Sequence, residues 1–325
     1  MRIVQDSNFH VHVSQTAYIE NIVEDEDDGT YSSQKYSSPH STEFSQDRSK
    51  DSSPKADQHD AEFFRKKTMQ LMYVAVRTRP DILLDVVVLS SRMKDPSIAD
   101  VEIAKRIISY LYNTRMFALT FRGGEIDAWG CTDASFNCYE NGRGHTGILF
   151  FLDKVSAAVV AKSMSQKVVS GSSTHAELIG LNEGVLHILW MVETIKELVR
   201  GIDIHPIKIY NDNQSMITLV KQPIVNRQGR SKFMNRALFK VNENIQAGEV
   251  AILYEATDTL VADFLTKAVH GSKFKSFKAK IMGSDHQEMT VCLNQLSYSI
   301  EESICHLLNG DKRDKLRILW LEASW

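Results

Sequence analysis

Residues 173–215 read STHAELIGLNEGVLHILWMVETIKELVRGIDIHPIKIYNDNQS. Apolar residues recur here in alternating steps of three and four, which predicts one long amphipathic helix ending near Gly201. The stripe consists of Leu178, Leu181, Val185, Ile188, Val192, Ile195 and Val199. After the helix, PIKIYND (206–212) predicts a strand and NQSMITLV (213–220) a second helix. Helices that alternate with strands are typical of an α/β sheet.

Further strands are predicted on both sides of this stretch. Upstream, four short apolar runs are separated by Gly, Asn and Asp turns, namely ALTFRG (118–123), IDAWGCTDASF (126–136), GILFFLD (147–153) and VSAAVVAK (155–162). Downstream, a basic loop and a helix lead to a strand, VAILYEA (250–256), and a last helix, TLVADFLTKAV (259–269). This order predicts an α/β fold with a mixed sheet and helices on its faces.

The rest of the chain divides by composition. Residues 1–23 predict a strand or hairpin and a short helix capped by Ser14. Residues 24–58 are acidic and rich in serine, which predicts a linker with few contacts. Residues 59–116 predict a small helical module broken at Asp95-Pro96. The α/β domain then covers residues 117–272, and residues 273–325 remain unassigned.

The overall composition excludes several classes of protein. With 325 residues, 43% of them apolar and 24% charged, the chain can bury a sizeable core, so it is not collagen-like, wholly disordered or a disulfide scaffold. Its four cysteines form no CxxC pair, which indicates a reducing compartment and argues against a zinc ribbon. Since no uninterrupted apolar run approaches ~18 residues and no signal peptide is recognisable, we expect no membrane partner and an intracellular location, cytoplasmic or nuclear.

Four carboxylates stand at matched places in these elements. Asp133 lies at the end of one predicted strand and Asp212 at the end of another, and the carboxyl ends of parallel strands converge at one sheet edge. Glu177 lies in the first turn of the long helix, and Asp263 lies in the last helix. Hard oxygen ligands suit Mg²⁺, with Mn²⁺ as a substitute, and two such ions promote phosphodiester hydrolysis.

Each carboxylate also has a purely structural interpretation. Thr174 and Glu177 fit a capping box, and Asp212 with Asn213 could cap the following helix. Asp133 could be a turn residue, and Asp263 could lie on a solvated helix face. The order of all four on matched elements favours the functional interpretation.

A basic segment follows the second helix. Residues 221–240 contain six cations, and no acidic residue occurs from 213 to 242. The cations are Lys221, Arg227, Arg230, Lys232, Arg236 and Lys240. Such a segment can bind phosphates by releasing counterions, and the alternative is an exposed loop without a partner.

Several of these blocks resemble a known family. CTDASF (131–136), SSTHAELIGLNEG (172–184), IYNDNQS (209–215) and VADFLTKAV (261–269) resemble the ribonuclease H domain of copia-type retrotransposon Pol polyproteins. LMYVAVRTRPDIL (71–83) and AKRIISYLYNT (104–114) are similar to the helical region that follows the reverse-transcriptase palm. Residues 1–23 are similar to the last palm strands and the first thumb helix.

The resemblance implies a fold, an activity and a site. It implies a ribonuclease H-like mixed five-stranded sheet with flanking helices behind a helical thumb or connection module. It also implies metal-dependent endonucleolytic cleavage of the RNA strand of RNA–DNA hybrids. Asp133 would hold both metal ions, Glu177 and Asp212 would complete one ion's shell, and Asp263 would hold the other. The residues expected to contact nucleic acid are Asn213, Gln214, Arg227, Arg230, Lys232 and Arg236.

The chain also departs from the family's pattern. The aromatic-x-Asp-Asp motif of the polymerase is missing, because the one Asp-Asp pair, Asp27-Asp28, lies in the acidic segment. We therefore expect no DNA synthesis by this chain. We also expect a separate intact reverse transcriptase or integrase as a partner. Phe233 replaces a histidine that copia elements usually carry after the basic loop. The alternative function is a catalytically inactive transposon remnant that folds and at most binds nucleic acid.

Overall fold

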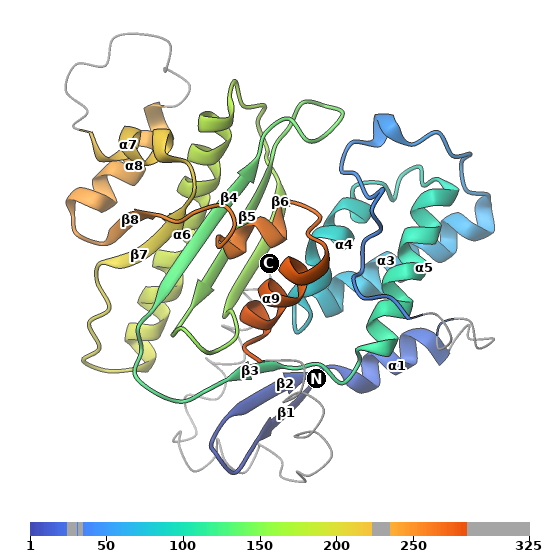
Figure 1. Ribbon diagram of the computed structural model, residues 1–325, viewed down its shortest axis with the longest axis horizontal. Coiled ribbons are helices and arrows are strands. Elements are labelled where there is room, and N and C mark those ends of the chain that lie inside the picture. The colour runs from blue at the N-terminus through green and yellow to red at the C-terminus, as the bar shows by residue number, and fades with distance from the viewer. Residues whose placement is uncertain (25–30, 32–34, 223–234, 285–325) are drawn as a thin grey trace.

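The computed structural model describes residues 1–24, 31, 35–222 and 235–284 (Figure 1). The larger of its two sheets has five strands in the order β6-β5-β4-β7-β8. Their bounds are β4 (Trp129–Ser135), β5 (His145–Phe151), β6 (Val160–Ser165), β7 (Ile207–Asn211) and β8 (Val250–Tyr254). β5 is antiparallel to β4 and β6, whereas β4, β7 and β8 are parallel. This mixed sheet is the ribonuclease H-like arrangement that the sequence predicts.

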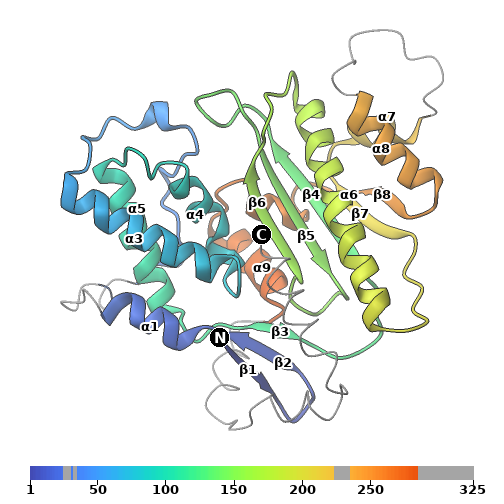
Figure 2. The same cartoon turned by 180° about the vertical axis from the view of Figure 1, so that it is seen from behind.

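One face of the sheet is covered by α6 (Ser173–Leu198), beside which lie α7 (Gln214–Lys221) and α8 (Asn235–Gln246) (Figure 2). The predicted apolar stripe is buried from Leu178 to Ile195, while Val199, just past the helix, is 44% exposed. The helix approaches β4 closely because Gly130 lacks a side chain, since a Cβ there would lie 2.5 Å from Cδ1 of Ile188. By length and composition α6 could cross a membrane, and its burial against the sheet accounts for the same apolar composition.

On the opposite face of the sheet lies a helical region built from both ends of the described chain. Its helices are α1 (Thr16–Glu24), α3 (Gln58–Ala75), α4 (Leu83–Ser90), α5 (Ile98–Asn113), α9 (Gly271–Met282), and the 3₁₀ helices η2 (Pro80–Ile82) and η3 (Val261–Leu265). Of these, α4 contacts β6, and η3 contacts β4 and β5. One continuous apolar core includes Leu71 and Ile107 of the helices together with Trp129 and Phe151 of the sheet. The predicted break at Asp95-Pro96 precedes Ser97, which caps α5 in a capping box with Asp100. The helical region and the sheet therefore share a single core.

One predicted strand belongs to a different sheet. β3 (Leu119–Phe121) pairs antiparallel with β2 (Val11–Ser14), which in turn pairs with β1 (Arg2–Gln5). Leu119 is buried with Val13 and with Met282 at the end of α9, so its apolar partners lie in the N-terminal hairpin and α9. Residues 118–123 therefore form a strand, as predicted, but outside the five-stranded sheet. The segment from residue 273, left unassigned above, begins within α9, and residues 285–325 lie outside the described residues.

The predicted linker is largely a packed segment. Residues 25–30 and 32–34 lie outside the described residues, but residues 35–57, here called the strap, run along the helical region and include η1 (Arg48–Lys50). Arg106 of α5 donates to the carbonyl of Pro39 at 3.0 Å, and Ser97 donates to Asp51 at 2.5 Å. His40 is only 4% exposed. The prediction of few contacts is wrong, because the aspartates and serines of the strap form local turns and tertiary hydrogen bonds.

Candidate active site

Asp133 lies inside β4, the central strand of the sheet, and not in a turn. Its side chain is 1% exposed, and its Oδ2 accepts a hydrogen bond from the hydroxyl of Thr266. Its other oxygen, Oδ1, has no hydrogen-bond partner among the described residues. A buried carboxylate oxygen without a donor is costly, so this atom is suited to a ligand that supplies positive charge.

Asp212 follows directly after β7, which is the parallel neighbour of β4. The ends of β4 and β7 therefore converge, as the sequence predicts. Asp212 does not cap α7, since Asn213 does so by accepting from the backbone nitrogen of Met216 at 2.9 Å. Instead, Oδ2 of Asp212 accepts from the hydroxyl of Thr257 at 2.7 Å. The capping interpretation thus applies to Asn213 and not to Asp212.

Asp263 lies on η3, a short 3₁₀ helix in place of the predicted α-helix 259–269. The segment packs tightly on β5 at Gly147, where a Cβ would lie 2.9 Å from the carbonyl oxygen of Ala262 and from Cβ of Leu265. Because Gly147 lacks a side chain, η3 can lie directly on the strand. Asp263 is 2% exposed, so it does not lie on a solvated helix face.

A buried histidine also fixes the end of η3. His145 Nε2 lies 2.6 Å from the hydroxyl of Ser163, and that hydroxyl donates to the carbonyl of Leu265 at 2.8 Å. Burial lowers the pKa of His145 to about 3, so the ring is neutral. Because Ser163 uses its hydrogen on Leu265, Nε2 of His145 is the donor and Nδ1 accepts from the hydroxyl of Tyr139 at 2.7 Å.

Three of the four predicted carboxylates come together. One ligand oxygen from each of Asp133, Asp212 and Asp263 lies within 4.8 Å of the other two. We call these three residues the carboxylate cluster. They come from a central strand, the end of its parallel neighbour and a 3₁₀ helix more than 50 residues farther along the chain.

Glu177 is not one of these three, but its charge interacts with the cluster. It is 6% exposed, and Nδ2 of Asn211 donates to its Oε2 at 3.0 Å. The capping-box interpretation is wrong, because α6 is capped by Ser172, whose side chain accepts from the backbone nitrogen of His175. Burial and the nearby charge of Asp133 raise the pKa of Glu177 to about 9.

Two lysines lie against the cluster. Nζ of Lys267 is 2.8 Å from Oδ1 of Asp263 and 3.4 Å from Oδ2 of Asp133. Nζ of Lys273 is 3.4 Å from Oδ2 of Asp263. Burial raises the pKa of Asp133 to about 6, although Lys267 opposes this rise. Partial burial lowers the pKa of Lys267, but the charges of Asp133 and Asp263 outweigh it and leave the pKa above its usual value.

These residues fit a divalent cation. The donors are hard carboxylate oxygens, the ligands that Mg²⁺ and Mn²⁺ prefer. Oδ1 of Asp133 accepts no hydrogen bond from the described residues. Burial, together with the charges of neighbouring carboxylates, raises the pKa values of Asp133 and Glu177, so a cation in the site would favour their ionised forms. The cluster is therefore suited to hold divalent metal ions.

The residues expected to contact nucleic acid are only partly described. Asn213 uses its side-chain oxygen to cap α7, and Gln214 is exposed at the start of that helix. Arg236 is exposed on α8. Arg227, Arg230 and Lys232, like Phe233, lie outside the described residues.

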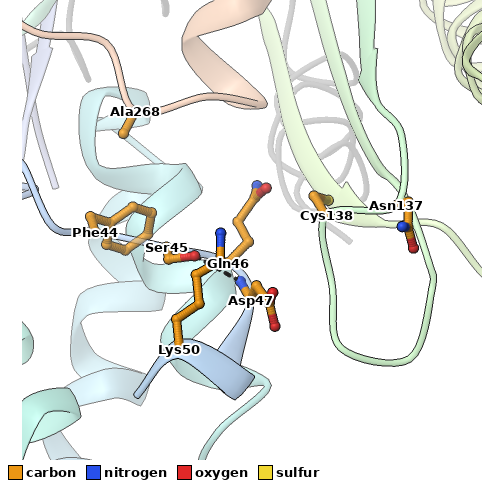
Figure 3. A pocket seen from close by; sticks show the side chains of 8 residues that line it. All are labelled: Phe44, Ser45, Gln46, Asp47, Lys50, Asn137, Cys138 and Ala268. Carbon is orange, nitrogen blue, oxygen red and sulfur yellow. Dashed lines mark hydrogen bonds between the residues drawn. The ribbon is translucent and has the colours of Figure 1, made fainter. Parts of the chain in front are cut away.

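A pocket of about 250 Å³ lies between the strap and the loop after β4 (Figure 3). The strap contributes Phe44, Ser45, Gln46, Asp47 and Lys50, and the other side is formed by Asn137, Cys138 and Ala268. Gln46 also donates to the carbonyl of Thr266 at 3.1 Å, the residue whose hydroxyl binds Asp133. Gln46 therefore links the pocket to the segment that holds Asp133.

Sequence reasoning missed the groups that hold the carboxylates. Asn211, Thr266 and Lys267 all lie in the quoted blocks IYNDNQS and VADFLTKAV, but no role was assigned to them. Their position directly beside Asp212 or close after Asp263 was the available signal. Thr257 carried no comparable signal, because its contact with Asp212 depends on the path of the chain after β8.

Two solved structures are similar to this chain, both with a low TM-score and a low sequence identity. LC11-RNase H1, isolated from compost by a metagenomic approach, matches 43% of this chain and 91% of its own at 12% identity, with a TM-score of 0.32. The same enzyme in complex with an RNA/DNA hybrid matches 41% of this chain and 88% of its own at 8% identity, with a TM-score of 0.29. The assignment of the fold is carried by the strand order and directions given above.

Comparisons of sequence give clearer relatives, although no protein-family model matches the chain. Secreted RxLR effector protein 161 of Plasmopara viticola is 34% identical over 123 residues, which are 37% of this chain and 85% of that protein. The Pol polyprotein from transposon TNT 1-94 of Nicotiana tabacum is 32% identical over 209 residues, or 64% of this chain. The Pol polyprotein from transposon RE2 of Arabidopsis thaliana is 29% identical over 223 residues, or 65% of this chain.

The matched region is a small part of the Pol relatives. The chain spans 15% of the TNT 1-94 polyprotein and 14% of the RE2 polyprotein. The five-stranded mixed sheet agrees with the resemblance read from the sequence. Over about 65% of its length the chain is homologous to retrotransposon Pol polyproteins, as the resemblance to copia-type elements predicts.

Proposed function

We propose that this protein cleaves the RNA strand of RNA–DNA hybrids in a metal-dependent, endonucleolytic reaction. The observation that carries the proposal is the carboxylate cluster: three acidic side chains from distant parts of the chain lie within 4.8 Å of one another. Two of them, Asp133 and Asp263, are almost completely buried, a costly arrangement for acids without a cationic ligand. The similarity of the chain to retrotransposon Pol polyproteins supports the same assignment.

In this proposal Asp133 would hold both metal ions, Glu177 and Asp212 would complete one shell, and Asp263 would complete the other. Such ions supply an activated water and stabilise the leaving oxygen in phosphodiester hydrolysis. The other residues orient the ligands. Asn211 holds Glu177, Thr266 holds Asp133 and Thr257 holds Asp212 through the hydrogen bonds described above.

Recognition of the substrate would rest on shape and phosphate contacts rather than on base sequence. The basic segment, with Arg227, Arg230, Lys232 and Arg236, would bind phosphates of the hybrid. Asn213 and Gln214 lie directly after Asp212 at the start of α7, so they would contact the strand close to the cleaved bond.

The proposal is tested with a hybrid whose RNA strand is labelled at one end. We expect RNA fragments to form with Mg²⁺ or Mn²⁺, none to form with a chelator, and activity to return when metal is added in excess. End-labelled double-stranded RNA and an end-labelled DNA duplex are the controls for substrate class. Both of these control substrates should stay intact. If the full chain binds the hybrid but releases no fragments with either metal, the inactive remnant is the correct interpretation.

A further inference from the structure

Lys267 lies between two buried carboxylates of the cluster. Its Nζ approaches Asp263 at 2.8 Å and Asp133 at 3.4 Å, and the side chains of these two acids are 3% and 1% exposed. The lysine side chain itself is 44% exposed. Its ammonium group therefore contacts the cluster while its chain remains accessible to solvent, so it can leave the cluster without disturbing the core.

Lys273 contacts the cluster differently. It reaches only Asp263 in the cluster, at 3.4 Å, and its Nζ also donates to the carbonyl of Thr257 at 3.1 Å and lies 3.8 Å from Asp258. Lys273 is therefore held at the edge by groups outside the cluster. Among the described ion pairs, Lys267 is the cation that joins two cluster carboxylates.

A cation at this place has two consequences. It offsets the repulsion between the carboxylates of Asp133 and Asp263, which are both shielded from water. Its contacts are with Oδ2 of Asp133 and Oδ1 of Asp263, so a divalent ion held by these two carboxylates would lie close to the ammonium group. The positive charges of the two cations would repel each other, so the binding of one weakens the binding of the other.

We propose that Lys267 is the resident counter-ion of the metal-free cluster and competes with divalent metal for Asp133 and Asp263. The inference rests on the metal site of the proposed function. Without metal, Lys267 stabilises the fold by balancing the charge of the two carboxylates. For the same reason it raises the metal concentration that is needed to fill the site. When metal enters, the ammonium group moves from the carboxylates into solvent.

The test compares thermal unfolding of the full-length wild type, Lys267→Met and Lys275→Met during titration with MgCl₂. Lys275 is an exposed lysine of α9 and provides a control of equal charge change. We expect metal-free Lys267→Met to unfold at a lower temperature than the wild type. We also expect it to reach half of its Mg²⁺-induced rise at a roughly tenfold lower concentration, as for the loss of one charge-assisted contact. Lys275→Met should follow the wild type in both respects.

The outcomes separate this inference from the proposed function. If neither Mg²⁺ nor Mn²⁺ raises the unfolding temperature of the wild type, the metal site itself is refuted. The proposed competition of Lys267 with metal is then refuted as well. If the wild type responds but Lys267→Met needs as much or more Mg²⁺, only the role of Lys267 is refuted. Lys267→Gln, which keeps a hydrogen-bond donor without the charge, is the second variant. If both variants unfold without metal, refolding on addition of Mg²⁺ supports the proposal, and a failure to refold refutes it.

Discussion

Nδ2 of Asn211 donates a hydrogen bond of 3.0 Å to Oε2 of Glu177, which joins the last residue of β7 to the first turns of α6. The same Nδ2 also donates to the carbonyl of Thr132 at 2.8 Å, the residue before Asp133. Asn211 therefore connects three elements directly behind the carboxylate cluster. It positions Glu177 beside the cluster rather than back towards the start of its own helix.

The pH dependence of stability tests the environment of Glu177. Its pKa is raised to about 9, so from about pH 4.5 to 9 the metal-free folded protein keeps a proton that the unfolded chain has lost. The stabilisation is complete at low pH and is lost as the pH rises towards 9. We expect the free energy of unfolding to fall by about 1–3 kcal/mol between pH 6 and 8 through this group. Urea unfolding in the presence of a chelator, repeated at several pH values, measures this free energy.

Glu177→Gln keeps the shape and can still accept from Asn211, but it does not titrate. The decline of stability between pH 6 and 8 should therefore become shallower in this variant. Glu197→Gln, at the exposed end of α6, is the matched control and should keep the wild-type decline. An equal decline in Glu177→Gln and the wild type would show that Glu177 is already ionised in the folded protein.

Gly147 tests how η3 is positioned. In Gly147→Ala, the added Cβ would lie 2.9 Å from atoms of Ala262, Leu265 and Thr266, so η3 must move and carry Asp263 with it. We expect a loss of about 1–3 kcal/mol in stability, typical of overpacking, together with a lower rate of hybrid cleavage. Gly123→Ala is the control, because no atom lies within 4 Å of a Cβ there. Full activity of Gly147→Ala would mean that the position of η3 is not critical.

His40 tests whether the strap is part of the folded unit. Its Nε2 lies 2.6 Å from the carbonyl oxygen of Val269, and its Nδ1 lies 3.4 Å from Oδ2 of Asp85. His40→Ala leaves both buried acceptors without this partner, so we expect a loss of about 2–4 kcal/mol and faster hydrogen exchange in residues 35–57. His59→Ala, whose side chain is 94% exposed in the wild type, should change neither quantity. Rapid exchange of the strap in the wild type would contradict the packed arrangement.

The basic segment gives a prediction about salt. Simultaneous replacement of Arg227, Arg230 and Lys232 by Gln should weaken hybrid binding and flatten its dependence on salt concentration, since each lost phosphate contact releases about one counterion fewer. Binding measured at several salt concentrations gives the slope. Arg200→Gln, at the opposite end of α6 from Glu177, is the control. An unchanged slope in the triple variant would show that the segment does not contact the phosphates.

The carboxylate cluster could be predicted because its members follow from local patterns. Asp133 lies two residues before the end of β4 and Asp212 directly follows β7, and the ends of parallel neighbouring strands converge. The stripe of α6 similarly gave the helix and its buried face. The partners of the carboxylates could not be derived in this way, because contacts such as Thr257 with Asp212 join residues 45 positions apart.

For a related reason, the strap was misjudged and the pairing partner of β3 could not be derived. The strap has the composition of a linker, yet Asp47 and Asp51 accept hydrogen bonds from Ser49 and Ser53, and His40 contacts a carbonyl 229 positions away. β3 has the pattern of any short strand, and its pairing with β2 depends on the preceding helices bringing the chain back to the hairpin. Composition and periodicity report neither of these long-range contacts.

The most direct test of the central claim compares Asp133→Asn with the wild type in Mg²⁺-dependent cleavage of a labelled hybrid. Asn keeps the size of the side chain but removes the charge that the proposed metal ions would share. We expect RNA cleavage to fall to background while hybrid binding, measured on the same samples, is unchanged. Metal-free Asp133→Asn should be at least as stable as the wild type, because it buries one charge fewer. Cleavage by Asp133→Asn at the wild-type rate would contradict the assignment of the carboxylate cluster as the catalytic site.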